Sequence, residues 1–274
     1  MTTSAGIAYE KARADGRAAL VGYLPAGFPT VDGGIAALRT MVEAGCDVIE
    51  IGLPYSDPVM DGPTIQAAAQ QALDAGVRTV DVLRTVEAVA ATGTPTLVMT
   101  YWNPVERYGV ERFAQDLYDA GGAGLITPDL TPDFAPEWIA AADARGLDKV
   151  FLVAPSSTDE RIAMTTAACR GFVYATAVMG VTGARAATSD LAGPLVTRTK
   201  RAIETASAGA PGLPVGVGLG VSNGTQAAEV ASYADGVIVG SAFVRVLLDH
   251  PDDLDAGRSA LAALTEDLAG GVRQ

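Results

Sequence analysis

Residues 20–29 read Leu-Val-Gly-Tyr-Leu-Pro-Ala-Gly-Phe-Pro, a short apolar run that ends in a turn. Such a run, bounded by Pro and Gly, is typical of a buried β-strand. The next segment carries apolar residues at helical spacing, at Ile35, Leu38 and Val42. The turn lacks the G-x-G-x-x-G fingerprint that follows the first strand of a dinucleotide-binding sheet. This first strand–helix unit therefore argues against an open Rossmann-type sheet.

The same alternation continues outward from this unit along the whole chain. Glycines stand where helices are expected to end, at Gly45, Gly76, Gly121 and Gly146. Residues 157–160, Ser-Thr-Asp-Glu, are interpreted as a capping box that opens a helix. Eight strands are predicted, at residues 20–24, 48–53, 97–101, 124–127, 150–154, 172–175, 215–217 and 236–239.

The composition agrees with a large folded core. Of the 274 residues, 49% are hydrophobic and only 19% are charged, so disorder of the whole chain is excluded. A barrel of about 250 residues is ordinarily a single domain. Because no linker-like break interrupts the eight units, we expect an α/β fold, a single (β/α)8 TIM barrel with extra helices, as one domain over residues 1–274.

The charge balance is acidic, with 32 Asp and Glu against 19 Lys and Arg and a net charge of -13. Basic residues cluster only at 197–201, so a nucleic-acid partner is not expected. No apolar run reaches ~18 residues and no signal-peptide pattern is present, so we expect no membrane association and a cytoplasmic location. The two cysteines, Cys46 and Cys169, fit a reducing compartment.

The chain contains a single histidine, His250, in the sequence Leu-Asp-His-Pro at an expected solvated helix end. With no second imidazole, His-dependent nucleophilic catalysis and His-ligated metal sites are disfavoured. The cysteines also lack the close spacing of a metal site. We therefore predict no metal, and acid–base chemistry that uses carboxylates, Tyr or Lys.

The second predicted strand carries a carboxylate on its inner face. Alternation places Ile49 and Ile51 toward the helices and Glu50 toward the barrel axis. Burial without a partner raises the pKa of a carboxyl group toward the range useful for acid–base catalysis. A structural ion pair is the alternative, but the predicted strands hold almost no basic residue, since Lys149 lies only at the start of one. This favours Glu50 as a catalytic group.

Asp61 lies in the loop after this strand, one residue before Gly62-Pro63, and Pro63 suits the first turn of the next helix. Two interpretations remain open. Asp61 is either a helix cap or a second carboxylate that faces Glu50 across a ligand at the barrel mouth. Two carboxylates in different environments can hold different protonation states at one pH.

Glycine-rich loops at residues 216–224 and 239–243 follow the last two predicted strands. In barrels these loops and a short helix N-terminus form the usual phosphate site, because glycine lets N–H groups approach an anion. One such loop could be explained as a tight turn alone. Two glycine-rich loops in this order predict a binding site for a phosphorylated small molecule. After the sixth strand, residues 174–185 form either a lid or an ordinary surface loop.

Several of these motifs together resemble the tryptophan synthase α-subunit family. Residues 49–58 read Ile-Glu-Ile-Gly-Leu-Pro-Tyr-Ser-Asp-Pro, and 61–66 read Asp-Gly-Pro-Thr-Ile-Gln. Residues 99–104, Met-Thr-Tyr-Trp-Asn-Pro, and 180–183, Gly-Val-Thr-Gly, also match. The likeness extends from residue 23 to residue 242, and the block that contains Glu50 is its most specific part.

The resemblance implies a lyase of tryptophan biosynthesis that cleaves indole-3-glycerol phosphate to indole and glyceraldehyde 3-phosphate, with no cofactor in this chain. At the matching positions, Glu50 would protonate the indole ring carbon and accept the proton of the side-chain hydroxyl, and Asp61 would hold the indole N–H. Tyr174 would position the substrate, and Thr182 would reach the loop aspartate when the lid closes. The positions that match the family's phosphate-binding backbone are Gly183, Gly220, Gly240 and Ser241.

The resemblance also implies a partner, the β subunit that carries pyridoxal phosphate, in an α2β2 heterotetramer. Leu219 replaces an aromatic residue often found in the family, and residues 176–179 lack its usual Ser and Arg. Three alternatives remain: a stand-alone indole-releasing lyase, a catalytically silent activating subunit, and a different phosphate-handling barrel such as an isomerase or aldolase. A Schiff-base aldolase is disfavoured because Lys11, Lys149 and Lys200 are poorly placed.

Overall fold

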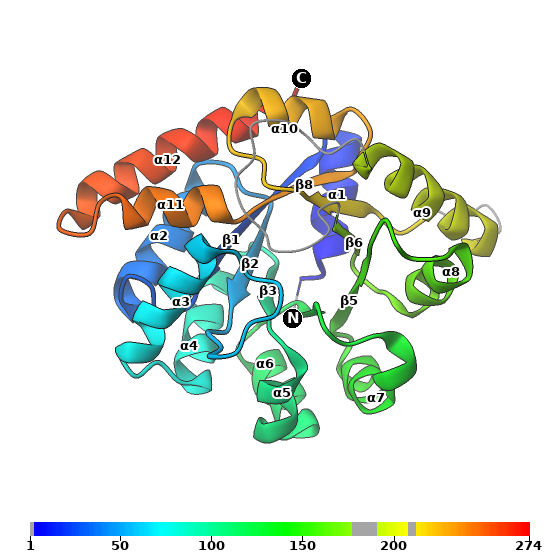
Figure 1. The fold of residues 1–274 in the computed structure, drawn as a ribbon, viewed down its shortest axis with the longest axis horizontal. Coiled ribbons are helices and arrows are strands. Elements are labelled where there is room, and N and C mark those ends of the chain that lie inside the picture. The colour runs from blue at the N-terminus through cyan, green and yellow to red at the C-terminus, as the bar shows by residue number, and fades with distance from the viewer. Residues whose placement is uncertain (1–2, 177–190, 208–211) are drawn as a thin grey trace.

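A computed structural model describes residues 3–176, 191–207 and 212–274. Eight parallel strands form a closed barrel in which each strand pairs with the next and β8 pairs with β1. Figure 1 looks into this ring of strands, with the helices arranged around it. The strands are β1 Ala19–Pro25, β2 Val48–Gly52, β3 Thr96–Met99, β4 Gly124–Thr127, β5 Asp148–Val153, β6 Val173–Thr176, β7 Val215–Gly218 and β8 Gly236–Val239.

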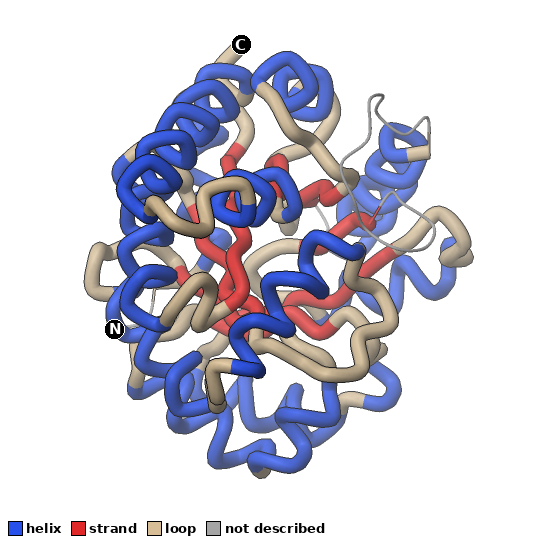
Figure 2. Tube along the Cα trace, turned by 60° about the vertical axis from the view of Figure 1, so that its left-hand side comes forward, coloured by secondary structure: helices blue, strands red, loops and turns tan. Residues whose placement is uncertain are grey.

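Helices connect successive strands and cover the outside of the barrel, as Figure 2 shows. The extra helices are α1 before β1 and the second helices that follow β2, β3 and β8. No helix in the described ranges has both the length and the apolar character needed to cross a bilayer. The helices are α1 Ala5–Ala14, α2 Val31–Glu43, α3 Pro63–Asp74, α4 Thr79–Ala90, α5 Trp102–Tyr108, α6 Val110–Asp119, the 3₁₀ helix η1 Pro132–Phe134, α7 Pro136–Arg145, α8 Asp159–Ala168, α9 Ala192–Ser207, α10 Gly224–Ala231, α11 Ser241–Leu248 and α12 Leu254–Gly271.

The barrel prediction is confirmed, and all eight strands lie within two residues of their predicted ends. The largest differences are in β3 and β5. β3 stops at Met99 because Tyr101 is already the N-cap of α5. The proposed capping box is wrong by one residue: Thr158 caps α8 by accepting a hydrogen bond from the Arg161 N–H. Ser157 instead accepts one from the Ala154 N–H, within the preceding turn.

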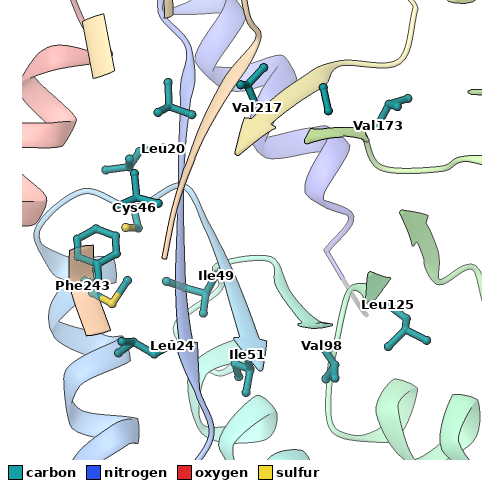
Figure 3. Packing of buried hydrophobic residues seen from close by; sticks show 14 of the residues in the cluster. Leu20, Leu24, Cys46, Ile49, Ile51, Val98, Leu125, Val173, Val217 and Phe243 are labelled. Atoms are coloured by element: carbon teal, nitrogen blue, oxygen red, sulfur yellow. The ribbon is translucent and has the colours of Figure 1, made fainter. Parts of the chain in front are cut away.

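Strand alternation separates two buried layers. Ile49 and Ile51 belong to the large layer between strands and helices, where Figure 3 shows them among its packed side chains. Val48 belongs to a smaller cluster inside the barrel, together with residues of α1. Glu50, which alternates with Ile49 and Ile51, is therefore on the inner face as predicted.

Glycines inside the barrel leave room for tyrosine side chains. A Cβ atom at Gly52 on β2 would collide with the Tyr23 hydroxyl, and one at Gly218 on β7 would collide with the Tyr174 hydroxyl. The two phenols therefore reach across to neighbouring strands near their C-terminal ends. This packing brings aromatic side chains beside Glu50, at the end of the barrel where (β/α)8 enzymes place their chemistry.

Candidate active site

A cavity opens at the C-terminal ends of the strands, with an empty volume of about 790 Å³ that includes the solvent at its mouth. Its wall is mostly apolar, which suits a flat apolar ring, and its polar groups are few. The residues that line it are Tyr23, Glu50, Met60, Asp61, Ile65, Met99, Pro128, Leu152, Tyr174, Thr176, Gly218, Leu219, Gly220, Ile238, Gly240 and Ser241.

Glu50 lines this cavity with only 1% of its surface exposed. Its Oε1 atom has no hydrogen-bond partner among the described residues. Burial raises the pKa of the Glu50 carboxyl from 4.5 to about 8. The alternative of a structural ion pair is wrong for Lys149, whose Nζ lies 2.5 Å from Asp143 Oδ1. Glu50 is thus a carboxyl group that is protonated at neutral pH and faces a cavity.

This burial predicts a pH-dependent stability difference between the wild type and Glu50→Gln. Because the folded-state pKa of Glu50 is raised, its favourable contribution is complete below pH 4.5 and is lost as the pH rises through about 8. Gln resembles the protonated acid and does not titrate. We expect equal free energies of unfolding near pH 4.5 and a variant more stable by roughly 3–5 kcal/mol at pH 9. Urea unfolding across this pH range measures the difference, and parallel curves would contradict the assignment.

Asp61 lines the same cavity from the loop between β2 and α3. Its interpretation as a helix cap is wrong, because Gly62 is the N-cap of α3 and Pro63 is the first helical residue. Burial raises the pKa of the Asp61 carboxyl, and a hydrogen bond from the Tyr101 hydroxyl opposes that rise. The loop therefore places a second carboxylate at the cavity, which agrees with the interpretation of Asp61 as a carboxylate at the barrel mouth.

Two tyrosines stand close to Glu50. Tyr174 lies on β6, and Tyr23 on β1 is the direct register neighbour of Glu50. Burial raises the pKa of both phenols well above 10, and the nearby charge of Glu50 raises them further. Both hydroxyls therefore stay protonated and can donate hydrogen bonds into the cavity.

Glycine and serine residues from the loops after β7 and β8 also line the cavity. Gly220 follows β7 with a left-handed φ of +88°, and Gly240 is the N-cap of α11, which begins at Ser241. No side chain of the described residues caps α11, so its first N–H groups are available to a ligand. By contrast, Asn223 caps α10 by accepting a hydrogen bond from the Gln226 N–H. An anion is therefore best accommodated at α11.

Not every predicted site residue can be placed. Thr182, Gly183 and most of residues 176–179 lie outside the described residues, whereas Thr176 lines the cavity. His250 follows α11 as expected, but it is half-buried, with Nδ1 2.8 Å from the Val246 carbonyl oxygen. In the described part of the chain, no three His, Cys, Asp or Glu side chains gather as a metal site would require.

Tyr23 and Tyr101 are site residues that the sequence analysis missed. Tyr23 could have been found, because it shares the inner face of β1 with Val21 and pairs in register with Glu50. Tyr101 offered no such signal. It lies beyond β3, and its hydroxyl meets a loop some 40 residues earlier in the chain. Leu219 lines the cavity as an aliphatic residue where the family often has an aromatic ring.

Comparison with known proteins identifies the family of the chain. A family model for the tryptophan synthase alpha chain matches residues 9–273. The tryptophan synthase alpha chain of Salinispora arenicola is 64% identical over 268 residues, which cover 98% of this chain and 97% of that protein. That of Acidothermus cellulolyticus is 60% identical over 272 residues, 99% of this chain and 98% of its own.

Solved structures give the same result. A chain of Mycobacterium tuberculosis tryptophan synthase superposes with a TM-score of 0.90 and 54% sequence identity, covering 100% of both chains. A structure from Aquifex aeolicus superposes with a TM-score of 0.86 and 34% identity, covering 98% of this chain and 99% of that one. The chain thus belongs to the tryptophan synthase alpha chain family.

Proposed function

We propose that Glu50 and Asp61 carry out the reaction of this family in the cavity described above. The chain is a lyase that cleaves indole-3-glycerol phosphate to indole and glyceraldehyde 3-phosphate in tryptophan biosynthesis. The observation that carries the assignment of roles is Glu50 itself. It is a buried carboxyl group with a pKa raised to about 8, and it faces a cavity that a second carboxylate also lines.

Glu50 starts protonated and transfers its proton to C3 of the indole ring. The ring becomes an indolenine, and positive charge develops at its nitrogen. Asp61 accepts a hydrogen bond from that N–H and stabilises the charge as a carboxylate. The ionised Glu50 then takes the proton of the C1′ hydroxyl while the C3–C1′ bond breaks. The electron pair of the C3–C1′ bond returns to the ring. The products are indole, an aldehyde and protonated Glu50, and no net proton is consumed.

The remaining cavity residues orient the substrate. The aliphatic wall, including Ile65 and Leu152, fits the indole ring, and the hydroxyl of Tyr174 lies near Glu50. We assign the phosphate to the backbone N–H groups around Gly220, Gly240 and Ser241, where the dipole of α11 favours negative charge. Thr182 and Gly183 complete the assignment through the family resemblance alone.

The proposal includes a β-subunit partner in an α2β2 complex, with pyridoxal phosphate bound only in that partner. Tryptophan synthase is the protein whose M. tuberculosis structure this chain resembles. Two large apolar side chains are exposed after the C-terminal ends of β2 and β4, Val59 at 72% and Phe134 at 76%. Such exposed apolar residues suit a protein interface. We also propose that the 274 residues act as one domain in the cytoplasm.

Indole release from indole-3-glycerol phosphate tests the function. The purified chain is assayed alone, and then with a tryptophan synthase β subunit and serine. We expect slow release alone and faster release with the partner. Equally fast release under both conditions would replace the partner role with a stand-alone lyase. No release under either condition, in a protein shown to be folded, would leave a silent subunit or another phosphorylated substrate and would refute the proposed roles of Glu50 and Asp61.

A further inference from the structure

Tyr101 lies behind Asp61 and outside the cavity wall. Only 6% of its surface is exposed, and within the described chain it is Asp61 that reaches the cavity. The Tyr101 hydroxyl accepts a hydrogen bond from the Met60 N–H at 3.0 Å. The same hydroxyl lies beside the next side chain, that of Asp61, and hydrogen bonding to it lowers the pKa of the Asp61 carboxyl. One phenol therefore fixes both the backbone and the carboxylate of two consecutive loop residues.

The backbone of Tyr101 is itself held in place. Tyr101 is the N-cap of α5, and the next N–H, that of Trp102, donates to both carboxylate oxygens of Asp129 at 3.0 and 3.1 Å. Asp129 belongs to the loop after β4. The N-terminus of α5 is thus tied to a neighbouring loop, and the phenol projects from a fixed point.

A second aromatic residue supports the ring of Tyr101. The ring of Tyr55 packs against it, with centroids 5.4 Å apart and planes inclined by 38°. The Tyr55 hydroxyl accepts a hydrogen bond of 2.9 Å from Asn103 Nδ2, in the first turn of α5. Tyr55 comes from the same loop as Asp61, so the loop is joined to α5 at two points.

We propose that Tyr101 is a positioning residue that aims the Asp61 carboxylate at the ring N–H of the substrate, and that Tyr55 and Asn103 hold Tyr101 in place. The proposal rests on the role given to Asp61 in the proposed function. A carboxylate on a loop has several rotamers, and a hydrogen bond to a charged acceptor is about twice as strong as a neutral one. Asp61 thereby meets the developing charge without first reorienting, which is the main advantage of a preorganised site.

The hydrogen bond also affects the titration of Asp61. It lowers the pKa of the carboxyl against the effect of burial, so removal of the Tyr101 hydroxyl leaves Asp61 with a higher pKa. The other titratable groups that face Asp61 within the described residues are Tyr23 on β1 and, across the cavity, Glu50 on β2. Since Asp61 acts as a carboxylate, the acid limb of the kcat/KM profile should move to higher pH.

Tyr101→Phe tests the proposal, because it removes the hydroxyl and keeps the ring. We expect kcat/KM for indole-3-glycerol phosphate to fall about ten- to a hundredfold, with the acid limb at higher pH. Inhibition by glycerol 3-phosphate, a probe of the phosphate end, should be unchanged. Tyr108→Phe is the matched control, because that hydroxyl donates to Asp116 Oδ2 at 2.6 Å and both residues lie on α5 and α6, outside the barrel. This control should retain full activity.

A double-mutant cycle separates positioning from a purely structural role. In an Asp61→Asn background, Tyr101→Phe should change kcat/KM by no more than about twofold, because the charge to be positioned is already gone. Equal losses of kcat/KM in both backgrounds, or full activity of Tyr101→Phe, would overturn the positioning role of Tyr101. The proposed function would still stand in that case, provided that Asp61→Asn alone lowers kcat/KM. Full activity of Asp61→Asn itself would refute the role of Asp61 and this proposal with it.

A second variant keeps the test valid if Tyr101→Phe does not fold. Tyr55→Phe removes the acceptor for Asn103 and retains the ring contact with Tyr101. We expect a smaller loss of kcat/KM, about two- to fivefold, with a shift of the acid limb in the same direction. An unchanged rate and pH profile in this variant would overturn the supporting role of Tyr55 and Asn103.

Discussion

Glu50→Gln is expected to lower the turnover of indole-3-glycerol phosphate by roughly 10³-fold or more, since one side chain carries out both proton transfers. Gln has the shape of the protonated acid, so the barrel and the phosphate end should be unaffected. It has no proton to give to C3 and no basic oxygen for the C1′ hydroxyl. Steady-state indole release, with binding of glycerol 3-phosphate measured in parallel, checks the result.

A second buried carboxylate provides the matched control. Asp148 is also fully buried in the barrel, but it lies at the start of β5, where it accepts hydrogen bonds from the Ala5 N–H at 2.7 Å and from Ser4 Oγ at 2.8 Å. Asp148→Asn should cost about 1–3 kcal/mol of stability and leave the turnover of the folded protein unchanged. If Glu50→Gln folds and keeps wild-type turnover, Glu50 is not the acid–base group.

Asp61→Asn is expected to lower kcat/KM by roughly 10²-fold. Asn retains an oxygen that can accept a hydrogen bond from the indole N–H and from Tyr101, so the variant removes the negative charge and little else. The loss therefore measures how much that charge stabilises the cationic indolenine. Rates should be taken with saturating and with limiting substrate, since binding and chemistry both involve the indole N–H.

Stability should respond little to this change, because Gly62, and not Asp61, caps α3. A capping residue would instead lose about 1 kcal/mol on substitution and leave the rate intact. Asp57→Asn is a control in the same loop, where the exposed Asp57 accepts a hydrogen bond of 2.5 Å from Ser56 Oγ. Its activity without a partner should match the wild type. A fully active Asp61→Asn would exclude the electrostatic role.

The sequence determined those features that depend on local patterns. Alternation along residues 48–52 placed Glu50 inside the barrel because side chains in a strand point to opposite faces. Glycine also marked the ends of two helices, at Gly45 and Gly146. The chain has positive φ angles of +120° and +69° at these residues, and glycine adopts such angles readily. The capping box at residues 157–160 failed by one position, since adjacent Ser and Thr can both cap and only the path of the chain chooses between them.

The tertiary structure alone decided which groups surround the two carboxylates. Among the described residues no basic side chain pairs with Glu50, which depends on side chains from many strands, and Lys149 is engaged by Asp143 instead. Asp61 lines the cavity from a loop whose Met60 N–H donates a hydrogen bond to Tyr101, a residue of the next strand–helix unit. Strand alternation has a period of two residues, whereas the contact between Tyr101 and the loop of Asp61 joins residues about 40 apart. A local pattern can therefore assign a side chain to a face, but its partners, and with them its pKa, are set by the closed barrel.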